Sequence, residues 1–136
     1  MKKLILALAL CLTACTTRSI HPPLGVEQTV TTGSPIVEWR ISSGMFPLRQ
    51  HTVKQLIYLG SVTGDVLRVA FKDEITKGQG AYGVLFRDRS YANELTYDTS
   101  KGKEITFQDI ELEVKDFDSS RIRYVVTKVP AEYQKK

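Results

Sequence analysis

The sequence predicts an all-β domain, a small antiparallel sandwich or barrel of about eight strands. Three observations support this prediction. From Ile36 onward, apolar residues recur with a period of two, as in strands that bury one face. Turns containing glycine or aspartate separate these runs. No stretch of ten residues has the i, i+3, i+4, i+7 pattern of an amphipathic helix. The short connections favour antiparallel pairing, because a parallel crossover needs a dozen or more residues.

The individual strands are predicted from this alternation. It is strictest in the last two strands, where every second residue is apolar. These apolar residues are Ile110, Leu112 and Val114 in one strand and Ile122, Tyr124 and Val126 in the other. The earlier strands are predicted over residues 37–42, 53–59, 66–71, 82–87, 92–97 and 104–107. Turns are expected at residues 60–65, 77–80, 98–102 and 117–120, with a further charged turn at residues 87–89.

The N-terminal segment combines a basic start with a short apolar run. Met1–Lys3 is followed by nine apolar residues, 4–12. A transmembrane helix needs about 20 such residues, so this run has instead the length of the hydrophobic region of a secretory signal. It ends in Leu-Thr-Ala-Cys at residues 12–15, which resembles the lipobox of bacterial lipoproteins. Residues 1–14 are therefore expected to be a cleavable signal helix.

The lipobox resemblance implies that Cys15 is the lipidation site and the first residue of the mature protein. Its sulfur would carry a diacylglycerol, and its new amine a further acyl chain such as palmitate. One acyl chain holds a protein only marginally, whereas two or three hold it stably. Thr16 follows, not aspartate, which resembles the default for the outer membrane in Gram-negative lipoproteins; a Gram-positive origin implies the plasma membrane. We expect an outer-membrane anchor with the domain facing the periplasm.

Processing at Cys15 also changes the charge and the thiol content. The whole chain has a formal charge of +4, from 19 basic and 15 acidic residues. Loss of Lys2 and Lys3 leaves 17 basic residues and a charge of +2, which gives no argument for a nucleic-acid partner. Because Cys11 leaves with the signal and Cys15 is acylated, the mature domain has no thiol for catalysis, disulfides or metal binding. That composition suits an oxidising periplasm.

The segments on either side of the domain contain few apolar residues. Residues 15–35 are expected to be the lipidated cysteine and a flexible tether, because they are rich in Thr, Ser, Gly and Pro. Such a tether would reach roughly 65 Å when extended and about 25 Å as a relaxed coil. The β domain is assigned to residues 36–130. The polar tail, residues 131–136, is expected to fray.

Two short motifs are weak candidates for ligand sites. Residues 78–83 match G-x-G-x-x-G, but the dinucleotide motif must open a helix within a βαβ unit, and a strand is expected here. Asp116, Asp118 and Ser120 resemble the start of a calcium loop, yet Arg121 and Thr127 stand where an EF-hand needs Gly and Glu. No cofactor and no metal site is therefore predicted.

Trp39, Met45 and Phe46 form the one candidate contact patch, beside Gly44 and Pro47. Exposed aromatic residues of this kind are common in protein interfaces. The alternative is that Trp39 and Phe46 fill the core. His51 has no second histidine at metal-ligand spacing, so neither catalytic residues nor an enzyme activity is predicted.

The strand pair with Gln-Leu-Ile-Tyr at 55–58 and Gly-Asp-Val-Leu-Arg-Val at 64–69, and the closing Ile-Arg-Tyr-Val-Val at 122–126, resemble a class of small bacterial outer-membrane lipoproteins. The likeness covers roughly residues 50–127 and implies no activity. We therefore expect a non-enzymatic structural or accessory component of the cell envelope that contacts a protein partner. The alternative is a periplasm-facing module that binds a small apolar or peptide ligand.

Overall fold

The computed structural model describes residues 16–44, 49–79 and 84–134, and only the backbone within 78–91. Most of this is β structure, which confirms the predicted all-β class. The nine strands of the described residues are β1 Thr17–His21, β2 Glu27–Thr31, β3 Pro35–Ser43, β4 Gln50–Thr63, β5 Val66–Gln79, β6 Val84–Asp98, β7 Glu104–Phe107, β8 Ile110–Phe117 and β9 Arg121–Lys128. Two three-residue 3-10 turns, η1 Thr99–Lys101 and η2 Ala131–Tyr133, complete them.

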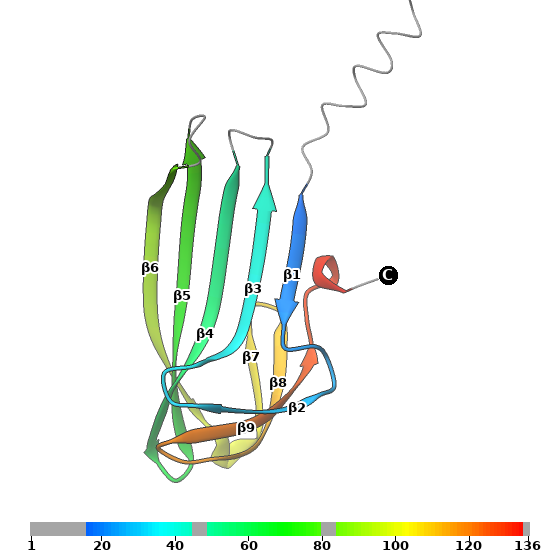
Figure 1. Ribbon diagram of the computed structural model, residues 1–136. Helices are drawn as coiled ribbons and strands as arrows, with labels where there is room; N and C mark the ends of the chain where they lie inside the picture. The colour runs from blue at the N-terminus through cyan, green and yellow to red at the C-terminus, as the bar shows by residue number, and fades with distance from the viewer. Residues whose placement is uncertain (1–15, 45–48, 80–83, 135–136) are drawn as a thin grey trace, which may run out of the picture.

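The strands form two antiparallel sheets that pack as a sandwich. The large sheet has the order β1-β3-β4-β5-β6, and the small sheet has the order β2-β9-β8-β7. In Figure 1 the large sheet stands upright, and β2 and β9 cross its lower end. No membrane-crossing helix is found within the described ranges, where the two helical segments have three residues each.

The core lies between the small sheet and the lower half of the large sheet. The alternation that predicted the strands places these core side chains correctly, since the apolar residues of even number in β8 and β9 are buried. Each sheet contributes about half of the core. The large sheet provides Ile36, Val37, Trp39, Leu56, Tyr58, Leu67, Val69 and Phe71, and the small sheet and its connections provide Ile105, Ile110, Leu112, Val114, Ile122, Tyr124, Val126 and Val129.

Hydrogen bonds between the sheets close the lower end of the sandwich. The Tyr58 hydroxyl donates to the carbonyl of Asp118 in the β8–β9 turn. The Tyr124 hydroxyl donates to the Ile36 carbonyl, and Thr32 donates through Oγ1 to the Ser119 carbonyl at 2.7 Å. Gly60 approaches the same turn so closely that an added Cβ would lie 3.0 Å from the Ser119 oxygen. Polar bridges therefore tie the sheets together at this end.

The upper half of the large sheet extends beyond the small sheet (Figure 1). The strands of the large sheet from β4 to β6 have 14 or 15 residues, whereas those of the small sheet have four to eight. Burial shows where the second layer ends. The first six residues of β4 are only half-buried, and fully buried positions begin at Leu56. In β5 the last buried residue is Phe71. Above this level the described molecule is a single sheet.

Several sequence predictions are corrected here. The segment expected to be a flexible tether contains β1 and β2, because their backbones pair with β3 and β9, which lie far along the chain. The charged turn expected at residues 87–89 lies within β6, where a register shift near Ile75 accommodates it. The strands predicted at 82–87 and 92–97 are thus one strand over the described residues. The predicted tail starts with η2, whose Tyr133 packs against the core.

Candidate functional site

The predicted lipidation site, Cys15, and the signal helix lie outside the described residues. What the structure does describe is how soon the fold begins. β1 starts at Thr17, only two residues after Cys15. Thr17 pairs with Ser42, and Ser42 in turn pairs with His51, so β1 starts at the upper end of the large sheet. An anchor on Cys15 would therefore be joined directly to the end of the sheet that carries no second layer.

Of the three residues in the predicted contact patch, only Trp39 lies within the described residues. Trp39 is 4% exposed and belongs to the core, which contradicts the expectation of a surface role. Its ring stacks on Phe71 with centroids 6.0 Å apart, and Phe71 lies 4.8 Å from Phe107 of β7. This agrees with the alternative, that the tryptophan fills the core. Met45 and Phe46 lie outside the described residues.

The aromatic cluster of Trp39, Phe71 and Phe107 marks the boundary at which the core ends. Immediately above it, the inner face of the large sheet carries Lys54 and Asp73, which are paired in register. Both are half-buried, and the Oδ1 atom of Asp73 is buried with no hydrogen-bond partner among the described residues. A buried carboxylate oxygen destabilises the folded state unless it accepts a hydrogen bond. The uncovered half of the sheet thus begins with a polar pair in which one carboxylate oxygen lacks a hydrogen-bond donor among the described residues.

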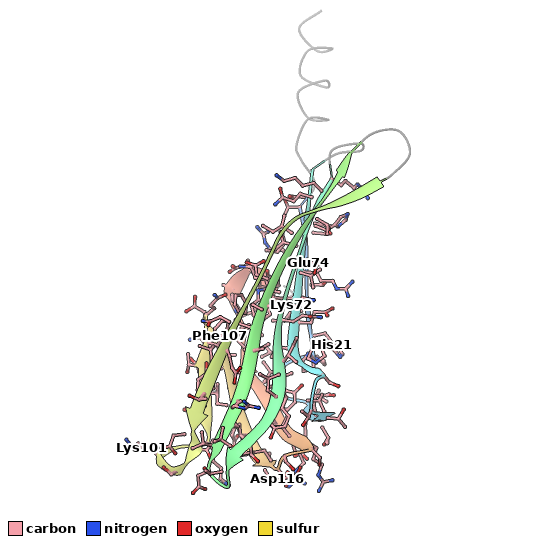
Figure 2. The ribbon with its side chains drawn as sticks, turned by 90° about the vertical axis from the view of Figure 1, so that its left-hand side faces the viewer. His21, Lys72, Glu74, Lys101, Phe107 and Asp116 are labelled. Atoms are coloured by element: carbon pink, nitrogen blue, oxygen red, sulfur yellow. The ribbon has the colours of Figure 1, made fainter. Side chains whose placement is uncertain are left out.

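The outer face of the large sheet is polar and internally paired. Glu38 accepts hydrogen bonds from Gln55 at 2.5 Å and from Arg40 at 2.7 Å. Burial opposes ionisation of Glu38, but these bonds outweigh it and hold the pKa of its carboxyl below the ordinary value. Figure 2 shows Lys72 and Glu74 on this face and Phe107 on the other side; the first two form an ion pair at 3.6 Å. These contacts satisfy Glu38 and Lys72, while the buried Nε of Arg68 on the same face has no hydrogen-bond partner among the described residues.

Among the described residues, Ser42 and His51 most resemble a catalytic pair of nucleophile and base. Ser42 Oγ lies 2.8 Å from His51 Nδ1, side by side on β3 and β4. A nucleophile of this type also needs a third group that orients the base. No described carboxylate hydrogen-bonds to His51, and no group of three metal-ligating side chains is found within the described ranges. The pair therefore gives little support to hydrolytic chemistry.

The edge of the large sheet at β6 is long and open. β6 has 15 residues and pairs with β5 on one side only, so its other side has no partner strand among the described residues. At its lower half the inner face carries Leu95 and Tyr97, which are half-buried and pack against the core. The outer face carries Glu94, which pairs with Arg68 at 3.1 Å. An unpaired edge of this length presents backbone groups that another strand can bind.

A groove of about 430 Å³ lies between β1 and the C-terminal turn η2. Apolar side chains form most of its lining, and Leu24 at its rim is 44% exposed. Its lining residues are Ile20, Pro23, Leu24, Val129, Tyr133 and Gln134. The volume falls within the range typical of small-ligand sites, about 300–1,000 Å³. Sequence reasoning missed this groove because it assigned both of its walls to flexible segments.

The candidate calcium loop serves instead as a structural turn. Oδ1 of Asp118 accepts from the backbone and hydroxyl of Ser120 at 2.7 and 2.6 Å and from the Arg121 backbone at 3.0 Å. These hydrogen bonds lower the pKa of the Asp118 carboxyl. Asp116 forms an ion pair with Arg123 at 2.7 Å. Both carboxylates therefore already have partners, hydrogen-bond donors for Asp118 and an arginine for Asp116. The G-x-G-x-x-G residues 80–83 lie outside the described ranges.

Comparison with known proteins finds no matching protein family, no matching curated protein and no matching solved structure. Three described features bear on function: the start of β1 beside Cys15, the open edge at β6, and the apolar groove beside η2.

Proposed function

We propose that this chain is a lipid-anchored envelope protein that acts without catalysis, as a structural or accessory component, by binding a protein partner. The lipobox-like residues 12–15 support the anchor, which would lie in the outer membrane with the domain in the periplasm. The single structural observation that carries the proposed contact is the unpaired edge of β6 in a sheet that is only half covered.

The chemistry around β6 indicates what kind of segment would bind there. A strand added to this edge would gain backbone hydrogen bonds for affinity and side-chain contacts on alternate residues for specificity. Its inward side chains would lie beside Leu95 and Tyr97, which are apolar and half-buried. Its outward side chains would lie beside Glu94. The partner is therefore an extended segment with apolar residues on one face and polar or basic residues on the other.

Photo-crosslinking in intact cells tests this contact. A photoreactive amino acid placed at Ala92 or Thr96, both exposed on β6, is expected to give one adduct of defined mass. The control position is Thr29, which is exposed on β2 at the edge of the other sheet. Ala92→Asp, combined with the crosslinker at Thr96, should reduce the adduct, because a charge on an edge strand discourages strand addition. Equal adducts from Thr29, or none from β6, would contradict the proposed contact.

The groove beside η2 supports a second candidate function, a module that binds a small apolar ligand. Its volume and apolar lining are the specific observation in its favour. The probe is N-phenylnaphthylamine, whose fluorescence rises in apolar surroundings. Leu24→Asp at the rim should abolish binding of this dye. Val62→Asp is the matched control, because Val62 is likewise exposed, at 58%, but is not among the groove residues. Equal dye binding by both variants would rule the groove out as the binding site.

A further inference from the structure

The short distance between Cys15 and β1 fixes which end of the domain can face a membrane. Thr17 is the second residue after the cysteine, and two residues span at most about 7 Å. Residues of one row across the large sheet lie at the same height as Thr17. The paired residues in that row are Thr17, Ser42, His51, Thr76 and Arg87. An acylated Cys15 would therefore hold this entire row close to the lipid headgroups.

Three basic side chains lie at this end among the described residues. Arg18 follows Thr17 and Arg49 precedes Gln50, and both side chains are exposed. Lys77 is also exposed and pairs with Gln50 in the last row that joins β4 to β5. The last two paired rows of β4 and β5 contain no Asp or Glu. Basic side chains near a bilayer are attracted to anionic headgroups.

We propose that the upper end of the large sheet rests on the bilayer, with Arg18, Arg49 and Lys77 against anionic headgroups. The proposal relies on the lipid anchor of the proposed function. The sequence predicted a long tether between the membrane and the domain. In this proposal the domain instead stands upright directly on the membrane. Val66, the first residue of β5, and Lys77, near its other end, are about 36 Å apart at about 3.3 Å per residue. The closed end of the sandwich is thereby held away from the surface.

Single fluorophores on the anchored protein test this orientation. The mature chain has no cysteine other than Cys15, so Arg49→Cys and Lys77→Cys can be labelled selectively at the upper end. Lys101→Cys and Lys103→Cys are the matched controls, because both lysines are exposed, and Figure 2 places Lys101 at the opposite end. The acylated protein is reconstituted in vesicles of phosphatidylethanolamine and phosphatidylglycerol, with and without a nitroxide on the headgroups.

The nitroxide is expected to reduce fluorescence at positions 49 and 77 by about half or more and to leave positions 101 and 103 unchanged, since about 36 Å separates the ends. Protein that stays on the vesicles with equal quenching at the two ends, or stronger quenching at 101 and 103, overturns the orientation and leaves the anchor intact. If the protein purified from cells carries no acyl chains at Cys15 and does not bind vesicles, the anchor is overturned, and with it the orientation.

A second pair of variants tests the charges with the anchor in place. Arg49→Glu with Lys77→Glu should weaken quenching of a label at the neighbouring Gln50→Cys position in vesicles that contain phosphatidylglycerol. Lys101→Glu with Lys103→Glu changes the net charge by the same amount at the other end and should have no effect. Equal responses of the two double variants would show that these cations do not contact the headgroups.

Discussion

The two halves of the large sheet are built from the same strands but face different surroundings. In the lower half every second residue is buried against the small sheet, and hydroxyl groups bridge the two layers. In the upper half the same strands continue without a fully buried described residue. The lower half therefore contributes most of the stability, whereas the upper half is available for contacts with a membrane or a protein. This division of roles can be tested by making the same change in both halves.

The largest difference is expected for matched isoleucine truncations. Ile36→Ala removes a side chain of β3 that is 1% exposed in the lower half and should lower the free energy of unfolding by about 3 kcal/mol. Ile75→Ala removes a half-buried side chain in the upper half and should cost about 1 kcal/mol or less. Urea unfolding measures both. Equal losses would mean that the upper half contributes as much to folding as the lower half.

A smaller effect is expected where β4 passes the β8–β9 turn. Gly60 has φ of +99° and lies close to Ser119, so Gly60→Ala should cost about 1–2 kcal/mol through strain and crowding. Gly64→Ala is the control, because no atom lies within 4 Å of its added Cβ, and it should change stability by about 0.5 kcal/mol or less. Thermal unfolding distinguishes them. Equal melting temperatures of the two variants would show that the structure accommodates a Cβ at position 60 without loss of stability.

The hydroxyl bridge from Tyr58 predicts an alkaline limit to stability. Burial and the charge of Asp118 raise the pKa of Tyr58 to about 12. Because the unfolded phenol ionises at about 10, the stability due to neutral Tyr58 should be complete below pH 10 and fall as the pH rises toward 12. Tyr58→Phe should cost about 1 kcal/mol at neutral pH and weaken this alkaline dependence. Urea midpoints between pH 8 and pH 12 test it; an unchanged slope in Tyr58→Phe would assign the dependence to other groups.

The smallest effect is expected at the acidic turn of the closed end. The pKa of Asp118 is lowered chiefly by hydrogen bonds from Ser120, so its stabilising effect should be present above its ordinary pKa and be lost as the pH falls through the lower folded value. Asp118→Asn should reduce the acid sensitivity of the urea midpoint. Asp98→Asn should do so less, since Asp98 Oδ1 accepts two hydrogen bonds where Asp118 Oδ1 accepts three. The reverse order would contradict this assignment.

The sequence predicted the strands in which burial is one-sided and missed those in which it is not. β7 was placed at its observed bounds, and the apolar residues of even number in β8 and β9 were assigned correctly to the core. The upper part of β5 and the middle of β6, residues 88–91, were missed because these stretches are mostly polar, so their alternation gives no signal. β1 and β2 were missed because their partners lie far along the chain. Ile20 and Val30, which pack against the core, were the available clue.

The candidate site could be predicted only where it depends on local sequence. The lipobox-like residues identify Cys15 as the expected anchor from four consecutive residues. The groove and the β6 edge depend on which distant segments meet, and no local pattern encodes that. Trp39 shows the same limit, because its type suits an interface or a core equally, and only the position of Phe71 and Phe107 beside it decides the matter.

The position of β1 also determines how the domain would respond to mechanical load. In a chain held at Cys15, tension between the membrane and the domain acts along β1, whose five residues pair antiparallel with β3. The hydrogen bonds of such a pair lie perpendicular to the strands, so a pull along β1 shears all of them at once and does not open them one by one. The strand next to the anchor is thus arranged as a mechanical clamp.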